Sequence, residues 1–158
     1  MTHTRTALTV AAALVVTGGL ITAAQATPPS GPPTVASNAT SGLLDGTNSP
    51  ARWTQDGIQL KTSRPTTVRT FTLTYPVGSD SGWHSHPGIV VAVVAAGTVE
   101  RRTSCGTDTF GVGDAFVEVG PHRVSNVGAV DAVLSITRIY PTSGESTPRI
   151  DEAEPVCS

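Results

Sequence analysis

The alternation of apolar and polar residues predicts β-strands over most of the chain beyond residue 50. Residues 66–75 alternate between two faces, and residues 89–96 form an unbroken apolar run between two glycines, as in a buried strand. Shorter strand patterns, separated by turn residues, cover residues 58–61, 98–103, 107–110, 115–119 and 124–127, and residues 131–140 form a last long one. No window beyond residue 52 combines a helical period with capping residues. Strands at this spacing predict an all-β sandwich or small barrel.

The first 26 residues carry the features of an export signal. A positive charge precedes a nearly uncharged apolar run over residues 6–21, and Ala24-Gln25-Ala26 has the small-x-small pattern that signal peptidases recognise. We expect cleavage after Ala26 and a secreted, extracellular protein with no membrane contact once the signal is removed. The alternative is a retained anchor, because an apolar run of roughly 16–20 residues nearly spans a bilayer. A bias towards Ala, Gly, Pro and Arg favours a bacterial source.

The remainder of the chain divides into three parts. Residues 27–50 are rich in Pro, Ser and Thr without apolar periodicity, which predicts a flexible linker. Residues 51–140 hold the strand patterns and form the expected single domain, and residues 141–158 are a polar, acidic tail. The formal net charge is −2 and no basic stripe is present, so a nucleic-acid partner is not expected.

Two cysteines, Cys105 and Cys157, are an even number in a chain that we expect to be exported. A disulfide is the default state of such a pair in an oxidising compartment. It would tie the tail to the middle of the domain and stabilise the fold by about 4 kcal/mol in the chain-entropy model. The alternatives are free thiols or a thiolate metal ligand. Ligation is disfavoured because neither cysteine lies beside a histidine.

Beyond the export signal, histidine occurs only as His84, His86 and His122. Side chains alternate along a strand, so His84 and His86 point to the same face and can offer two ligands to one ion. His122, on or beside another strand, supplies a third. Three imidazoles bind a divalent metal and leave positions open for water or a small molecule. The alternative is three separate surface or hydrogen-bonded histidines.

The residues around these histidines resemble the two sequence motifs of the cupin superfamily. The first set is Gly78, His84, His86 and Gly97, and the second is Gly113, Asp114, Gly120, Pro121, His122 and Asn126. The resemblance covers residues 66–140 and is closest to the type-2 cupin barrels. It implies a single-domain double-stranded β-helix, or jelly-roll barrel, with a divalent metal inside. By analogy it also implies a homodimer paired through sheet edges.

The chain departs from the cupin pattern at the residue four after the second histidine. The family has a glutamate there, and this chain has Val90. The remaining set resembles three-histidine cupins, such as thiol dioxygenases, in ligand count alone. Three neutral imidazoles leave the charge of a divalent ion uncompensated, which favours an anionic ligand or a bound water with a lowered pKa. Glu118 is the candidate substitute and acid–base group, although Pro121 obscures which way it points, and a solvent-facing position is the alternative.

Several functions fit this reading. The first is a metal-dependent enzyme acting on a small molecule, with iron implying oxygen chemistry and zinc implying hydrolysis or lyase chemistry. Manganese, nickel and copper are also candidates. The second is a non-enzymatic module that binds metal or a small ligand, and the third is a purely structural barrel. Beside Glu118, only Tyr75 is a candidate general acid, with packing at the barrel rim as its alternative. Sequence does not separate these functions, because cupins serve many.

Overall fold

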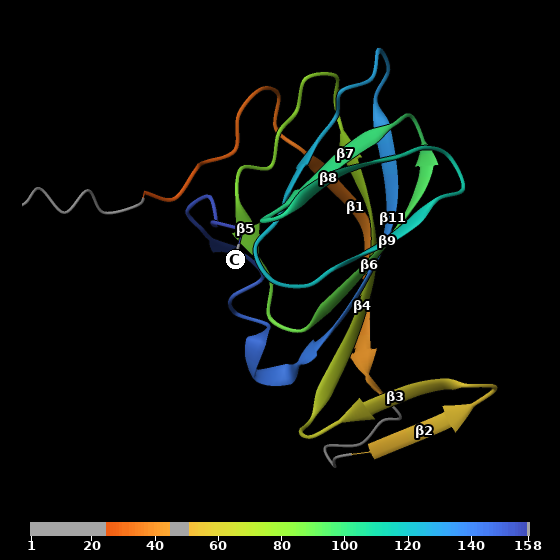
Figure 1. Ribbon diagram of the computed structural model, residues 1–158. Coiled ribbons are helices and arrows are strands. Elements are labelled where there is room, and N and C mark those ends of the chain that lie inside the picture. The colour runs from red at the N-terminus through yellow and green to blue at the C-terminus, as the bar shows by residue number, and fades with distance from the viewer. Residues whose placement is uncertain (1–24, 45–50, 158) are drawn as a thin grey trace, which may run out of the picture.

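The computed structural model describes residues 25–44 and 51–157 (Figure 1), and every structural statement below concerns these residues. Apart from Gln25 and Ala26, the expected export signal lies outside them. No helix within the described ranges has the length and apolar character needed to cross a membrane.

The described part of the chain is built almost wholly from β-strands, as the sequence predicts. Twelve strands are present. They are β1 (Val35–Leu43), β2 (Ala51–Gln55), β3 (Ile58–Thr62), β4 (Thr66–Tyr75), β5 (His84–Ser85), β6 (Ile89–Ala96), β7 (Val99–Thr103), β8 (Gly106–Phe110), β9 (Ala115–Glu118), β10 (Arg123–Ser125), β11 (Ala132–Pro141) and β12 (Ile150–Asp151). A short 3-10 helix, Thr142–Gly144, follows β11.

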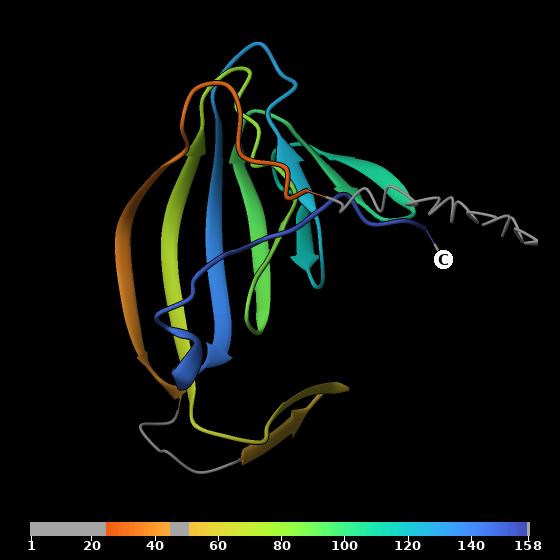
Figure 2. The ribbon, with the colours of Figure 1, turned by 90° about the vertical axis from the view of Figure 1, so that its left-hand side faces the viewer.

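The principal sheet is antiparallel and has the strand order β1-β4-β11-β6-β9. A three-stranded sheet, β10-β7-β8, and the short pair β12-β5 lie across from its inner face (Figures 1 and 2). The core between them is formed by Tyr75, Val90, Ala92, Val94, Val99, Phe116, Val124, Ala132, Leu134 and Ile136. The core residues of β6 and β11 recur at every second position, because each of these strands buries one face only. From β4, Tyr75 is buried in this core, and Phe71 and Leu73 pack against it partly buried.

The apolar run over residues 89–96 is a strand, but it is not buried on both faces. Val90, Ala92 and Val94 are in the core, whereas Ile89 and Val93 on the other face are 46% and 40% exposed. A continuous apolar run therefore predicts a strand, but it does not show whether one or both faces of that strand are buried.

The predicted flexible linker over residues 27–50 is wrong for Val35–Leu43, which forms the edge strand β1. This strand pairs with β4 from Val35 opposite Thr74 to Leu43 opposite Thr67, with a break in register after Ser37. All nine residues of β1 are exposed, so neither face carries an apolar stripe and the sequence gives no signal. Backbone pairing, rather than side-chain burial, places the strand. The barrel consequently begins before residue 51.

Residues 51–62, which were expected to belong to the barrel, lie outside it. They form the β2–β3 hairpin, a separate two-stranded sheet that stands away from the barrel (Figures 1 and 2). The alternation of residues 58–61 was a correct sign of a strand but did not reveal which sheet the strand joins. The expected barrel boundaries of 51–140 are therefore wrong at the N-terminal side.

The C-terminal tail is fixed to the barrel, and the predicted disulfide is confirmed. Cys105, in the turn between β7 and β8, is bonded to Cys157. Between the barrel and this bond, β12 pairs with β5, placing Ile150 opposite Ser85 and Asp151 opposite His84. The disulfide therefore holds the tail beside the strand that carries the first histidine motif.

Asp80 connects three segments that are distant in sequence. Its carboxylate accepts hydrogen bonds from the Arg123 guanidinium at 2.7–2.9 Å, from the Ser125 hydroxyl at 2.6 Å and from the Gly82 N–H at 2.8 Å. Its backbone pairs with Ser30 of the N-terminal segment. Burial raises the pKa of Asp80, but the hydrogen bonds from Arg123, Ser125 and Gly82 outweigh it and hold the pKa below its usual value.

We predict that Asp80→Asn lowers the free energy of unfolding at neutral pH by about 2 kcal/mol, because it removes charge-assisted hydrogen bonds. A carboxyl with a lowered pKa stabilises the fold fully above its unfolded pKa of about 4, and this contribution is lost as pH falls from there through the lower pKa of the folded state. Denaturant unfolding of parent and variant at pH 7 and pH 3 should therefore show a difference that shrinks at pH 3. Asp108→Asn, which breaks an exposed pair with Arg101, is the control, and an equal loss in both variants would contradict the prediction.

Candidate metal centre

The structure brings His84, His86 and His122 together at the inner side of the barrel, as the sequence predicts. His84 lies on β5 and pairs with His122, which precedes β10, through two backbone hydrogen bonds of 2.8 and 2.9 Å. One ring nitrogen from each of the three histidines lies within 4.8 Å of the others. His84 and His122 are buried and His86 is partly buried, so the group faces the interior rather than the surface.

Each imidazole is oriented by a backbone carbonyl. The Nδ1 atoms of His84, His86 and His122 lie 3.0, 2.7 and 2.9 Å from the carbonyl oxygens of Gly82, Pro148 and Gly120 respectively. A carbonyl oxygen only accepts, so in the neutral ring Nδ1 carries the proton and Nε2 carries the lone pair. The Nε2 atom of His122 is buried without a hydrogen-bond partner among the described residues. Three Nε2 lone pairs are thus available in one place, which is the arrangement of a histidine metal site.

The surroundings keep two of these rings neutral. Burial, followed by repulsion from the neighbouring His122, lowers the pKa of His84 to about 3. Burial also lowers the pKa of His86 below its usual value, in spite of the opposing charge of Glu118. Neutral imidazole is the form that binds metal, so both rings are in the ligating state at neutral pH.

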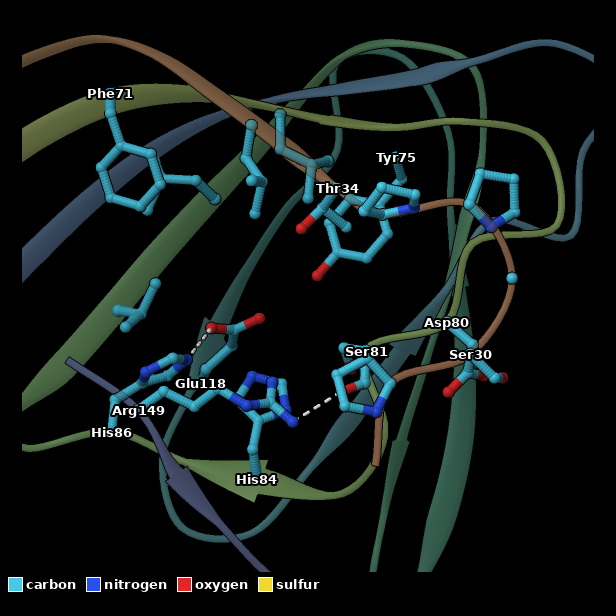
Figure 3. Close-up of a pocket in the computed structure, with 18 of the residues that line it drawn as sticks. Ser30, Thr34, Phe71, Tyr75, Asp80, Ser81, His84, His86, Glu118 and Arg149 are labelled. Atoms are coloured by element: carbon cyan, nitrogen blue, oxygen red, sulfur yellow. Dashed lines mark hydrogen bonds and ion pairs between the residues drawn. The ribbon is translucent and has the colours of Figure 1, made fainter. Parts of the chain in front are cut away.

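Glu118 points into the same site, and the solvent-facing alternative is wrong. Its side chain is 7% exposed, and its Oε2 atom lies 3.3 Å from His122 Nε2. The same atom lies 3.6 Å from His86 Nε2 (Figure 3). Glu118, on β9, stands directly opposite Val90 on β6. Residues paired across strands share a face, so the carboxylate enters from the strand next to the position where the cupin pattern has its glutamate.

Tyr75 is buried at the end of β4 and forms part of the cavity wall beside Thr34 (Figure 3). Burial, with a smaller effect from the negative charge of Glu118, raises the pKa of its phenol well above the usual value. The phenol therefore stays protonated and can donate a hydrogen bond. Tyr75 also belongs to the hydrophobic core, which agrees with the alternative that it packs rather than acts as a general acid.

A cavity of about 400 Å³ opens beside the histidines. Its walls include Phe71 and Leu73 from β4, and Leu134, Ile136 and Arg138 from β11. This volume is in the range of small-molecule sites, and the mixture of apolar walls with a few polar groups is typical of them.

Two parts of this site were not identified from sequence. One is the N-terminal segment from Pro29 to Thr34, which was read as linker but lines the cavity (Figure 3). Gly31 shows how closely it packs, because a Cβ there would overlap the carbonyl oxygen of Gly78. The other is a pair of arginines, Arg138 and Arg149. Arg138 could have been found from sequence, because it is a charged residue at an inward position of the alternating strand pattern over residues 131–140. Nothing in the sequence of the tail marks Arg149 as part of the site.

The tail completes the site from the other side. Pro148 supplies the carbonyl that orients His86, and the Ser85 hydroxyl donates to the carboxylate of Glu152 at 2.7 Å. Arg149 donates to the Ser81 carbonyl at 2.6 Å (Figure 3). The disulfide at Cys157 thereby constrains the segment that orients one of the three histidines.

We predict that replacing both Cys105 and Cys157 with serine weakens zinc binding by about tenfold, because the carbonyl that orients His86 becomes mobile. Competition titration against a zinc chelator measures this change, with thermal unfolding to confirm that the variant is folded. Glu154→Gln, which removes only the tail's ion pair with Arg102, is the matched control and should bind zinc like the parent. Unchanged zinc affinity in a folded double variant would show that the tail does not organise the site.

Comparison with known proteins gives structural neighbours alone. No family model and no curated protein matches the chain. An uncharacterised protein with a double-stranded β-helix domain from Klebsiella pneumoniae is 19% identical, with a TM-score of 0.44, over 54% of this chain and 75% of its own. The cupin domain of Schizosaccharomyces pombe Cnp3 is 12% identical, with a TM-score of 0.44, over 60% and 64%. An oxalate oxidase is 18% identical, with a TM-score of 0.41, over 48% and 46%.

The TM-scores are below 0.5, so neither the fold nor the function of this chain is inferred from these neighbours. The assignment depends on the chain itself, whose antiparallel sheets face each other with the two histidine motifs meeting between them. The chain has the double-stranded β-helix fold of the cupins.

Proposed function

We propose that the protein binds a divalent metal ion through the Nε2 atoms of His84, His86 and His122 and presents it to a small molecule in the adjoining cavity. The observation that carries this proposal is that a backbone carbonyl engages Nδ1 of every one of the three rings. Histidines without a shared ligand have no reason to expose three unprotonated nitrogens within 4.8 Å of one another in a buried site.

Glu118 supports the proposal through charge. Three imidazoles are neutral ligands, and one nearby carboxylate offsets half of the charge of a divalent ion. Its Oε2 atom, 3.3 and 3.6 Å from two of the ligating nitrogens, is placed either to join the ligands or to accept a proton beside them. We therefore propose Glu118 as the carboxylate that serves in place of the family glutamate missing at Val90.

The ligand set suits several ions, and the ion would determine the reaction. A redox-active ion such as iron, manganese or copper supplies electron transfer and oxygen chemistry, and zinc or nickel supplies Lewis acidity and an activated water. In either case Glu118 would hold or move a proton, Tyr75 would donate a hydrogen bond and the apolar walls would exclude bulk water.

The second candidate function is metal or ligand binding without catalysis. It is favoured by the scarcity of acid–base groups in the cavity, where the pKa of Tyr75 is too high for easy proton transfer. A buried carboxylate beside the histidines favours an enzyme instead, because a storage site has no need of a proton acceptor there. We further propose that the protein is exported, since a disulfide that organises the site forms readily in an oxidising compartment.

We predict that the purified, untagged protein contains close to one equivalent of metal by elemental analysis, and that His84→Ala and His122→Ala abolish it. Thr109→Ala, at an exposed position on β8 outside the cavity, is the control and should keep the metal. Absence of metal from the parent, even after equilibration with iron, zinc, manganese, nickel and copper, would refute the proposal.

We predict that Glu118→Gln weakens metal binding by about tenfold to a hundredfold, because it removes the negative charge and leaves the shape of the side chain unchanged. Chelator competition measures the effect. Glu100→Gln, on β7 and outside the cavity, is the control and should leave the affinity unchanged. Equal affinity in parent and Glu118→Gln would show that this carboxylate is not part of the metal centre.

A further inference from the structure

Arg138 is a buried cation in the wall of the cavity. It lies on β11, at the same inward parity as Leu134 and Ile136, and is 7% exposed. Its guanidinium lies over the ring of Tyr140, with 4.9 Å between Cζ and the ring centroid. The aromatic ring supports one face of the guanidinium and leaves its edges free for hydrogen bonding.

One edge of this guanidinium is unpaired. Its Nε and Nη2 atoms are buried and have no hydrogen-bond partner among the residues that the structure describes. These two nitrogens belong to the same edge, where their N–H bonds run parallel and match the two oxygens of a carboxylate. Buried donors without acceptors cost free energy, so an arginine in this position is best explained by an anionic partner that binds in the cavity.

Two other arginines show how this chain normally satisfies the same edge. Arg123 donates from Nε and Nη2 to the Asp80 carboxylate at 2.7–2.9 Å. Arg149 donates from Nε to the Asp151 carboxylate at 2.6 Å. Arg138 alone of the three has no carboxylate at this edge from the described part of the chain, and its side chain forms part of the cavity wall.

We propose that Arg138 binds the carboxylate of a small organic acid whose other end reaches the metal centre. The contact of the acid with the metal centre rests on the proposed metal-binding function, whereas its contact with Arg138 does not. The apolar body of the acid would lie along Phe71 and Leu73 on β4 and along Leu134 and Ile136 on β11, which form the wall between Arg138 and Tyr75.

The register of the sheet sets the length of such an acid. Arg138 stands opposite Val90, and Val90 stands opposite Glu118 at the metal centre. Two strand spacings separate the Arg138 and Glu118 backbones by about 10 Å, and both side chains extend inward from them. A chain of a few carbons between two oxygen-bearing groups bridges this space and fits a cavity of about 400 Å³.

Inorganic phosphate shares the anionic oxygen chemistry and is the main competing ligand. A tetrahedral anion would bind the guanidinium edge but would leave the apolar wall between Arg138 and Tyr75 without contact. The combination of a planar two-donor edge with an apolar wall therefore favours a carboxylate on a short carbon chain over phosphate.

Isothermal titration calorimetry on the whole purified protein tests the inference, in metal-loaded and in chelator-treated samples whose metal content is measured. The probes are glutarate and butyrate, the uncharged butyramide, and inorganic phosphate. We expect the two acids to bind the metal-loaded parent, glutarate more tightly, and butyramide and phosphate to bind about tenfold more weakly or not at all. Arg138→Gln should lower acid affinity by about tenfold or more, with Arg138→Lys intermediate, and leave metal content unchanged.

Arg69→Gln is the matched control, because Arg69 stands opposite Arg138 on β4 but does not line the cavity. It removes the same charge from the neighbouring strand and should change acid affinity far less than Arg138→Gln. The comparison of butyrate with butyramide on the unmodified protein needs no variant, so the test remains decisive if Arg138→Gln fails to fold.

The inference is overturned if butyramide binds as tightly as butyrate, if phosphate binds more tightly than both acids, if no acid binds, or if a folded Arg138→Gln variant retains full acid affinity. Failure of the metal proposal is recognised separately. A parent that takes up no metal but binds butyrate through Arg138 would refute the metal centre and retain the carboxylate subsite.

Discussion

Three backbone carbonyl groups determine what this barrel can bind. The carbonyls of Gly82, Gly120 and Pro148 each accept a hydrogen bond from the Nδ1 atom of a histidine, so the opposite nitrogens converge unprotonated on one buried point. The two glycines lie in the turns that precede His84 and His122, and both have positive φ angles, +64° at Gly82 and +72° at Gly120. The backbone conformation of these turns therefore orients the two rings, because it aims the carbonyl and the imidazole two residues later at each other.

The site depends on both ends of the described chain as well as on the barrel. The N-terminal segment packs over the cavity through the pairing of Ser30 with Asp80, and the tail supplies Pro148 and Arg149 from beyond the last long strand. Cys157 holds that tail to the β7–β8 turn. The main sheet supplies the inward row of Arg138, Val90 and Glu118, which places a cation and an anion on either side of an apolar residue. In the proposed complex, one carboxylate of the acid lies at Arg138 and the other end of the acid reaches the metal centre beside Glu118.

Sequence predicted the parts of this structure that leave an amphipathic trace. The strands β6 and β11 each bury alternate side chains, and the three histidines were found because the chain has no others beyond its first segment. β1 could not be predicted, because all of its residues are exposed and only backbone pairing defines it. The direction of Glu118 could not be predicted either, since the left-handed turn at Gly120 interrupts simple alternation between it and His122. The roles of Pro148 and Arg149 arise from the path of the tail, which local pattern does not encode.

The most direct test of the account is the tautomeric state of the histidine rings in the metal-free protein, measured by long-range proton–nitrogen NMR correlation at neutral pH. The account predicts that His84, His86 and His122 all carry their proton on Nδ1, and that zinc shifts the three Nε2 resonances together. A protonated Nε2 in any of the three rings, or zinc-induced shifts at Nδ1, would contradict the claim that the backbone carbonyls prepare one metal centre.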